Sequence, residues 1–147
     1  MQTLISQLLM EKGREVLTIA PAATVFEAVK LMDEKNVGSL VVLNSRGRIA
    51  GIFVERDALQ RVLLAGKSAK TEPVQAVMTR KVVCALPEMT IDQCLALMTD
   101  KQVRHLPVID KEQKLVGLVS MGDLVKFISS EQIAMIRNRE NYIEGVL

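Results

Sequence analysis

Apolar residues in the first half of this 147-residue chain are spaced so as to predict a strand, a helix, a β-hairpin and a second helix. A short apolar run at 16–19 indicates the strand. Apolar residues at every third or fourth position over 25–32 are typical of a helix with one buried face. Two further apolar runs, 39–43 and 48–54, flank a short polar turn and therefore predict the hairpin. A second helix is expected over 56–64.

The same order of elements occurs a second time, at an offset of 66 residues. Residues 16–59 align with residues 82–125 without a gap, and 11 of the 44 aligned positions are identical. Such a repeat predicts an α+β fold (α/β-type) in which a β-α-β-β-α unit occurs twice. The elements expected in the second copy are strands at 82–84, 105–109 and 114–120, a helix that begins after Thr90, and a helix at 122–129.

Both copies carry the signature of a helix start at the same place. Thr24 is followed three residues later by Glu27, and Thr90 is followed in the same way by Gln93. In a capping box of this kind, each side chain accepts a hydrogen bond from the backbone N–H of the other residue. The first helix of each copy is therefore predicted to begin directly after its threonine.

The repeat also divides the chain into segments. Short apolar segments at 5–10 and 74–78 are expected to form a helical turn at the start of each copy. A unit of about 45 residues is too small for a good core, so the two copies are expected to pack together. The hairpin strands show little alternation, which predicts sheets covered on both faces. The expected segments are a first repeat at 1–65 (core 16–64), a linker at 66–73, a second repeat at 74–130 (core 82–129) and a C-terminal helix at 131–147.

Composition excludes several classes of protein. Leu, Ile, Val and Phe make up one third of the chain, which excludes an intrinsically disordered protein. The longest uncharged apolar-rich stretch, 16–26, is too short to span a membrane. A net charge of +2 gives no basis for binding nucleic acid or an anionic membrane. With three Phe, one Tyr and no Trp, the chain lacks the aromatic residues on which single-strand binders stack bases.

The two cysteines and the N-terminus point to an ordinary intracellular protein. Cys84 and Cys94 lie among small and apolar residues, without the spacing of metal ligands, so reduced thiols in the core and no metal site are expected. The first residues lack the basic and long apolar regions of a signal peptide. We therefore expect a cytoplasmic protein.

Each copy ends in an apolar strand, a glycine, two further apolar residues and, four positions later, an aspartate that opens a helix. The residues that carry this pattern are 51–57 and 117–123, together with 37–42 and 103–108. A tandem of this unit resembles the paired cystathionine-β-synthase-type domains, called the CBS pair or Bateman module, over about residues 5–130. The resemblance implies two repeats related by a pseudo-twofold axis, with two related clefts, and commonly a homodimer. The ending 142–145 looks like that of small stand-alone members of the family.

The resemblance implies an adenosine-containing ligand such as AMP, ADP, ATP or NAD. A helix N-terminus and the Ser120 hydroxyl suit a phosphate, and the Asp123 carboxylate can accept hydrogen bonds from both ribose hydroxyls. The resemblance assigns these same roles and completes the site with a lead-in segment, 12–18, and the first copy's strand start around the base. The residues expected at this first site are Ser120, Asp123, Arg104, His105, Lys12, Val16, Val37, Gly38 and Ser39.

The second site is expected to be weaker. The first copy has Val54 where the second has Ser120, so it lacks the hydroxyl donor. A lost hydrogen bond to a charged group costs roughly 1.5–3 kcal/mol. The residues expected at this site are Asp57, Arg56, Val54, Arg80, Val82 and Val103.

Simpler roles remain open for these residues. Ser120 and Asp123 are favoured residues for a helix cap, and His105 suits the start of a strand. The function expected first is a non-catalytic adenosine-nucleotide sensor that acts on an unidentified effector protein. The alternatives are a ligand-free interaction module and an S-adenosylmethionine binder. An enzyme is not expected, because no motif supplies a nucleophile–base pair, a metal cluster or a phosphate-binding Walker loop.

Overall fold

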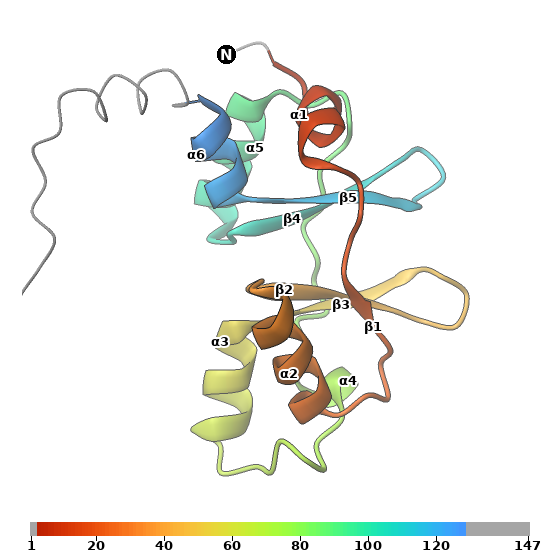
Figure 1. The fold of residues 1–147 in the computed structure, drawn as a ribbon, viewed down its shortest axis with the longest axis vertical. Coiled ribbons are helices and arrows are strands. Elements are labelled where there is room, and N and C mark those ends of the chain that lie inside the picture. Colours follow the sequence, from red (N-terminus) through yellow and green to blue (C-terminus); the bar gives the residue numbers. More distant parts are fainter. Residues whose placement is uncertain (1–2, 129–147) are drawn as a thin grey trace, which may run out of the picture.

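The computed structural model describes residues 3–128, which form two stacked halves (Figure 1). The helix predicted at 131–147 lies outside the described residues. In chain order the elements are α1 (Ile5–Lys12), β1 (Thr18–Ile19), α2 (Val25–Lys35), β2 (Ser39–Leu43), β3 (Ile49–Val54), α3 (Glu55–Asp57), η1 (Ala58–Leu63), α4 (Val74–Val77), α5 (Ile91–Lys101), β4 (His105–Ile109), β5 (Leu115–Ser120) and α6 (Met121–Ile128).

The predicted helix starts are confirmed. The Thr24 hydroxyl accepts the N–H of Glu27 at 3.1 Å, and the Glu27 carboxylate accepts the N–H of Thr24 at 3.4 Å. The second box has the corresponding distances of 3.1 and 2.9 Å between Thr90 and Gln93. The helix predicted over 56–64 is also present, but the greater part of it, η1, is a π-helix.

The first strand of each copy departs from the prediction. β1 covers only Thr18–Ile19 and pairs in parallel with β2, which is antiparallel to β3. The strand predicted at 82–84 was wrong. The second copy has a single parallel bridge from Ala85 to Val108, beside the antiparallel pair β4–β5.

Pro107 accounts for the missing strand. In the first copy, the N–H of Val41 in β2 donates to the carbonyl of Leu17 at 3.2 Å and holds β1 in the sheet. The corresponding residue of β4 is Pro107, and proline has no N–H to donate. The second copy therefore cannot form the same ladder.

The helices that open the two copies are exchanged between the halves. Ile5 and Leu9 of α1 belong to one buried core with residues of α5, β4, β5 and α6. Val74 and Val77 of α4 belong to the other core, with residues of α2, β2 and β3. Figure 1 shows α1 in the half that contains α5 and α6, and α4 in the half that contains α2.

Hydrogen bonds hold the two exchanged helices in the same way. The N–H of Ile5 donates to the carbonyl of Met89 at 2.8 Å, and the N–H of Val74 donates to the carbonyl of Ala23 at 2.8 Å. Each half of the molecule thus contains core residues from both copies. The predicted repeat limits, 1–65 and 74–130, follow the chain and do not coincide with the halves in space.

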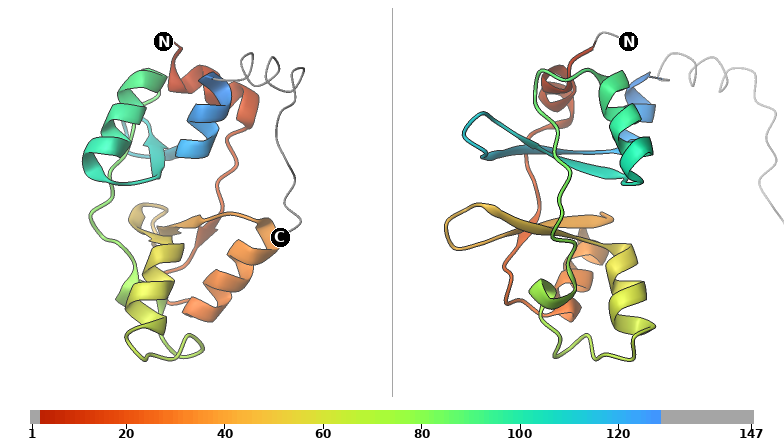
Figure 2. Two further views of the ribbon diagram at one scale, coloured as in Figure 1. Left: turned by 90° about the vertical axis from the view of Figure 1, so that its left-hand side faces the viewer. Right: turned by 180° about the vertical axis from the view of Figure 1, so that it is seen from behind.

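The sheets lie in the middle of the molecule and the longer helices lie outside them (Figure 2). Residues 13–17 and 79–84 connect the halves on opposite sides (Figures 1 and 2). Leu40 and Val41 point to opposite faces of β2, and both are fully buried. Both faces of this sheet are therefore covered, as predicted from its lack of alternation.

Candidate functional site

Asp123 lies where β5 ends and α6 begins. Its Oδ2 accepts the N–H of Ser120 at 2.8 Å, and its own N–H donates to the Ser120 hydroxyl oxygen at 3.0 Å. The two residues therefore form the helix cap that was one of the alternatives. The cap leaves the hydroxyl proton of Ser120 free to donate, and Oδ1 of Asp123 accepts no hydrogen bond from any described residue.

Lys12 reaches this carboxylate from the exchanged helix α1. Its Nζ donates to Asp123 Oδ2 at 2.5 Å and to the Leu118 carbonyl at 2.6 Å. Burial by itself raises the pKa of Asp123. The hydrogen bonds from Lys12 and Ser120 and the charge of Lys12 outweigh burial and hold this pKa below its usual value. The carboxylate is therefore ionised at neutral pH, and its contacts come from both copies of the repeat.

Gly38 meets His105 between the two halves. A Cβ at Gly38 would lie 3.6 Å from His105 Nε2 and 3.2 Å from Glu55 Oε1. The backbone N–H of Glu55 donates to the Gly38 carbonyl at 3.2 Å. At the equivalent positions of the second copy, the N–H of Met121 donates to the Arg104 carbonyl at 2.8 Å. The sequence interpretation missed Glu55, although its position at the start of α3 corresponds to that of Met121 beside Asp123.

The pKa of His105 is lowered, mainly because the half-buried ring is partly shielded from water. The negative charges of Asp123 and Glu55 raise this pKa, and the positive charges of Lys12 and Arg104 lower it. The net shift is downward from the ordinary value of about 6.5.

Stability should therefore depend on pH below about 6.5. Between the folded pKa of His105 and that of the unfolded chain, the unfolded state binds more protons, so the free energy of unfolding falls as the pH falls. His105→Asn should remove this slope in urea unfolding measured across the range. His105 is the single histidine of the chain, so one imidazole NMR signal reports its pKa directly. A titration midpoint above that of a model peptide would contradict the prediction.

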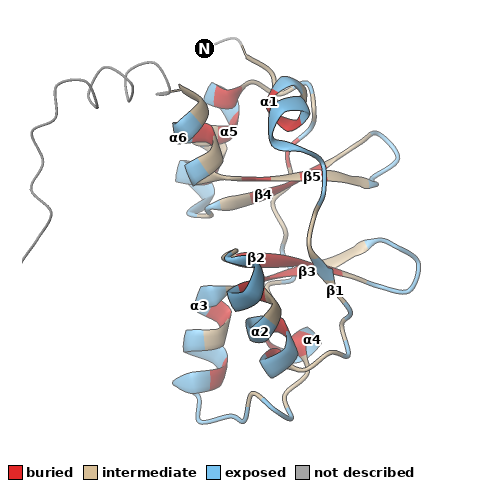
Figure 3. Ribbon diagram, viewed as in Figure 1, coloured by how far each residue is buried: buried red, intermediate tan, exposed pale blue. Residues whose placement is uncertain are grey.

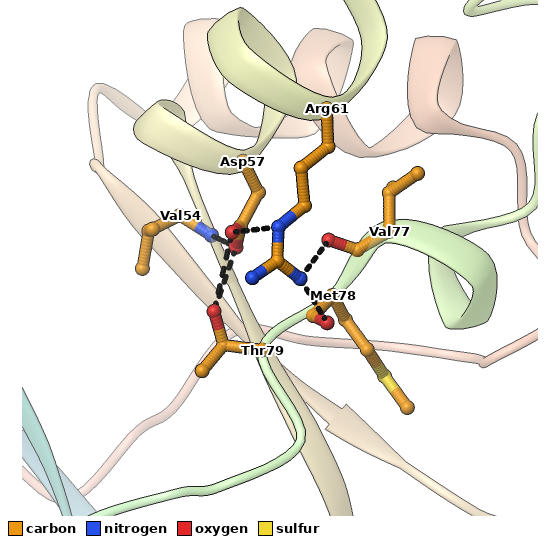
Figure 4. Close-up of polar contacts among 6 residues, drawn as sticks. All are labelled: Val54, Asp57, Arg61, Val77, Met78 and Thr79. Atoms are coloured by element: carbon orange, nitrogen blue, oxygen red, sulfur yellow. Dashed lines mark hydrogen bonds and ion pairs between the residues drawn. The ribbon is translucent and has the colours of Figure 1, made fainter. Parts of the chain in front are cut away.

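Asp57, at the position equivalent to Asp123 in the first copy, is more deeply buried and has different hydrogen-bond partners (Figure 4). Its side chain is 6% exposed, against 27% for Asp123. Oδ2 accepts the N–H of Val54 at 3.0 Å, and Oδ1 accepts the hydroxyl of Thr79 at 3.1 Å. Arg61 Nε lies 3.8 Å from Oδ1. Both oxygens of Asp57 are therefore engaged within the chain.

Arg61 extends this arrangement to α4. Its Nη1 donates to the carbonyls of Val77 and Met78 at 3.2 and 3.0 Å, which are acceptors at the end of that helix. Figure 4 shows the guanidinium between the Asp57 carboxylate and these two carbonyls. The sequence interpretation missed Arg61 and Thr79. A spacing of four residues from Asp57 on one helix was the signal for Arg61.

Of the other residues expected at the second site, Val54 is the one that hydrogen-bonds Asp57 within residues 3–128. The Arg80 guanidinium donates to the Gln75 carbonyl at 2.9 Å, and the Val82 N–H donates to the Arg80 carbonyl at 3.1 Å. Val103 packs against the core that contains residues of α1, α5 and α6, and Arg56 is exposed. Val54 contributes only its backbone N–H to the carboxylate.

The remaining residues expected at the first site lie at several places. Ser39 is 2% exposed at the start of β2, and Val37 packs against the core of the first copy. Val16 lines a cleft between the tips of the two hairpins, together with Arg14. The structure thus places Lys12, Ser120 and Asp123 in direct contact, with Gly38 and His105 nearby, and Val16 elsewhere along the lead-in segment.

Both cysteines are free thiols, as expected, but Cys84 is only half-buried and Cys94 alone of the two belongs to a core. Cys94 is fully buried, and burial raises its pKa to about 11; burial also raises the pKa of Cys84. Among residues 3–128, there is no group of three or more His, Cys, Asp or Glu side chains that could hold a metal ion. In the same part of the chain, no helix has the length and apolar character needed to cross a membrane.

Comparison with known proteins gives one family. A model of the CBS domain matches residues 5–64 and again residues 74–130. The chain is 36% identical over 151 aligned residues to the CBS domain-containing protein CBSX3, mitochondrial, of Arabidopsis thaliana, covering 97% of this chain and 73% of that protein.

Solved structures show the same fold. A CBS-domain protein from Burkholderia ambifaria is 39% identical with a TM-score of 0.84, and the match covers 97% of this chain and 100% of that one. The CBS domain pair of protein MJ0100, solved with 5'-methylthioadenosine and S-adenosyl-L-methionine, has a TM-score of 0.78, with coverage of 89% and 99%. At 22% identity, this second likeness shows the fold alone.

Proposed function

Because this chain belongs to the CBS domain family and carries two copies of the domain in tandem, we propose that it binds an adenosine-containing ligand without transforming it. The proposed ligand is AMP, ADP, ATP or a molecule of the NAD type, bound between the halves at Asp123. Stand-alone CBS-pair proteins are regulatory modules rather than catalysts. The chain would thus act as a sensor.

The state of Asp123 carries the proposal. Its carboxylate is ionised, partly exposed and has one oxygen open, as an acceptor of ribose hydroxyls requires. The Ser120 hydroxyl and the N-terminal N–H groups of α6 lie beside it and suit a phosphate. Arg104 directly precedes β4 and His105 begins it, and their side chains would supply donors for further phosphate oxygens.

We propose one ligand per chain. Asp57 is buried, and Val54 and Thr79 already donate to both of its oxygens, so a ribose would have to break these bonds first. This contrast supports the prediction of unequal sites and gives it a second cause besides the missing hydroxyl at Val54.

Lys12 is the element through which ligand binding would affect the rest of the molecule. It ends α1, and the segment that follows it crosses to the other half. A ribose that competes with Lys12 for Asp123 would release this end of the crossing segment. A ligand with different affinities for the two arrangements shifts the balance between them, and a bound effector protein would detect that shift.

A thermal-shift series with AMP, ADP, ATP, NAD, NADH and S-adenosylmethionine tests the proposal. A ligand that binds the native state alone stabilises it by about 2.7 kcal/mol at a concentration of about 100 Kd, so at least one nucleotide should raise Tm. Asp123→Ala should abolish the shift because it removes the ribose acceptor. Asp100→Ala, an exposed aspartate on α5, is the matched control and should leave the shift unchanged.

Other results would favour the alternatives. Absence of a shift with all six compounds at millimolar concentration would contradict ligand binding and favour a ligand-free interaction module. A shift with S-adenosylmethionine alone would favour that ligand, which is one of the two bound in the MJ0100 structure.

We also propose that two copies of the chain associate. Large apolar side chains are exposed on α2 (Phe26 and Val29) and on η1 (Leu59 and Leu63). Figure 3 shows α2 and α3, the helix that η1 continues, in the same half of the molecule. Exposed apolar surface of this kind is typical of an association site. The effector protein and a cytoplasmic location remain predictions from the sequence.

A further inference from the structure

A cleft with a volume of about 570 Å³ opens between the tips of the two β-hairpins. The turns after β2 and β4 form its two walls, and the lead-in segment after α1 contributes Arg14 and Val16. β5 begins at Leu115, in the cleft, and ends at Ser120. The cleft therefore lies at the opposite end of this strand from Asp123.

The repeat brings equivalent positions of the two turns to the same cleft. Arg48 and Lys114 are 66 residues apart and both line it, as do Arg46 and Glu112. Two of these four positions, Arg48 and Lys114, thus present one cation from each copy. No single copy of the repeat contains this arrangement.

Equivalent hydrogen bonds hold the backbone of both turns. The side-chain oxygen of Asn44 accepts the backbone N–H of Arg48 at 3.0 Å, and that of Asp110 accepts the N–H of Lys114 at 2.9 Å. The backbone that carries the two cations is therefore held in place, while their side chains remain exposed.

The cleft has a surplus of unpaired positive charge. Its lining contains four cationic side chains, Arg14, Arg46, Arg48 and Lys114, and one acid, Glu112. The side chains of these four cations form no ion pair and no hydrogen bond with any residue between 3 and 128. Like charges that outnumber the acidic groups beside them repel one another, and an anion between them relieves the repulsion.

The geometry points to a small anion as the occupant: we propose that this cleft binds a molecule that carries a chain of phosphate groups. Several cations around one volume suit a multivalent anion better than a single phosphate, and guanidinium groups bind phosphate oxygens in pairs. The volume is in the range of small-molecule sites. The site is separate from Asp123, so the proposal does not rest on the proposed adenosine site.

Tripolyphosphate and orthophosphate, titrated calorimetrically into the full chain at low salt, test the proposal. Tripolyphosphate should bind more tightly than orthophosphate. Arg48→Gln combined with Lys114→Gln should weaken it at least tenfold, because the double variant removes two positive charges that would hydrogen-bond the phosphates. Lys111→Gln is the matched control, since Lys111 is exposed on the same turn but does not line the cleft. Unchanged melting temperatures would show that the exposed substitutions preserve the fold.

Two outcomes would overturn the proposal. Equal weakening by Lys111→Gln would show that tripolyphosphate responds to general surface charge. Loss of binding in Asp123→Ala would show that it occupies the adenosine site instead. Retained binding in Asp123→Ala supports a separate site, and competition by ATP in that variant would then distinguish a nucleotide tail from free polyphosphate as the source of the phosphate chain.

Discussion

Replacing Asp57 with alanine should lower the free energy of unfolding by about 3 kcal/mol, against about 1 kcal/mol for Asp123→Ala. Asp57 is the more buried of the two, and its removal leaves the Val54 N–H and the Thr79 hydroxyl without their acceptor. Asp123 is partly exposed, so water can replace the lost acceptor for its neighbours. Urea unfolding at neutral pH measures both values.

The same pair of substitutions should affect ligand binding in the opposite order. Asp123→Ala should remove nucleotide binding, while any folded Asp57→Ala protein should retain it. Thr79→Val is the control, because it removes one donor to Asp57 and leaves the carboxylate, with an expected cost of about 1 kcal/mol. Equal losses of stability, or loss of binding only in the double variant, would contradict different roles for the two aspartates.

Gly51→Ala should be strongly destabilising, by about 3 kcal/mol. A Cβ at Gly51 would lie 2.8 Å from the carbonyl oxygen of Thr79 and 2.6 Å from Met78 Sδ. The Thr79 backbone cannot retreat easily, since it exchanges two hydrogen bonds of 2.9 Å with Ile52. The glycine of the first repeat is therefore required by the close approach of the segment that follows α4. Thermal and urea unfolding measure the effect.

Gly117→Ala is the matched control at the equivalent position, with an expected cost of about 1 kcal/mol. There the new Cβ would meet the two terminal methyl groups of Leu9, each at 2.7 Å, and a flexible side chain can rotate away. Leu9→Ala should make Gly117→Ala nearly neutral in a double-mutant cycle. A larger loss at Gly117 than at Gly51 would contradict this explanation of the shared glycine.

Local chemistry explains why much of the fold could be predicted from the sequence. The capping boxes at Thr24 and Thr90 involve residues three positions apart, so the helix starts follow from short-range pattern alone. The hairpins follow from apolar runs around a polar turn. The 66-residue repeat then predicted that one order of elements occurs twice, since the pattern of each copy could be compared with that of the other.

Contacts between distant segments explain what could not be predicted. A short apolar helix such as α1 does not reveal which half it will cover, so its exchange with α4 was not foreseen. One partner of Asp57, Thr79, lies twenty-two positions away along the chain, and no local pattern joins these two residues. Pro107 could be read from the sequence. That it removes a strand became clear only from the structure, where the N–H of Val41, at the equivalent position, holds β1 in the sheet.

The exchange of α1 and α4 bears on how two copies came to differ. In a polypeptide with a single copy, the opening helix could pack only against a second molecule. Two such polypeptides would form both cores as a symmetric dimer with exchanged helices. In that dimer the two aspartates would have identical neighbours. Joining the copies through 66–73 frees the two positions to evolve separately, so that Asp57 can become a fixed internal anchor while Asp123 stays open to solvent.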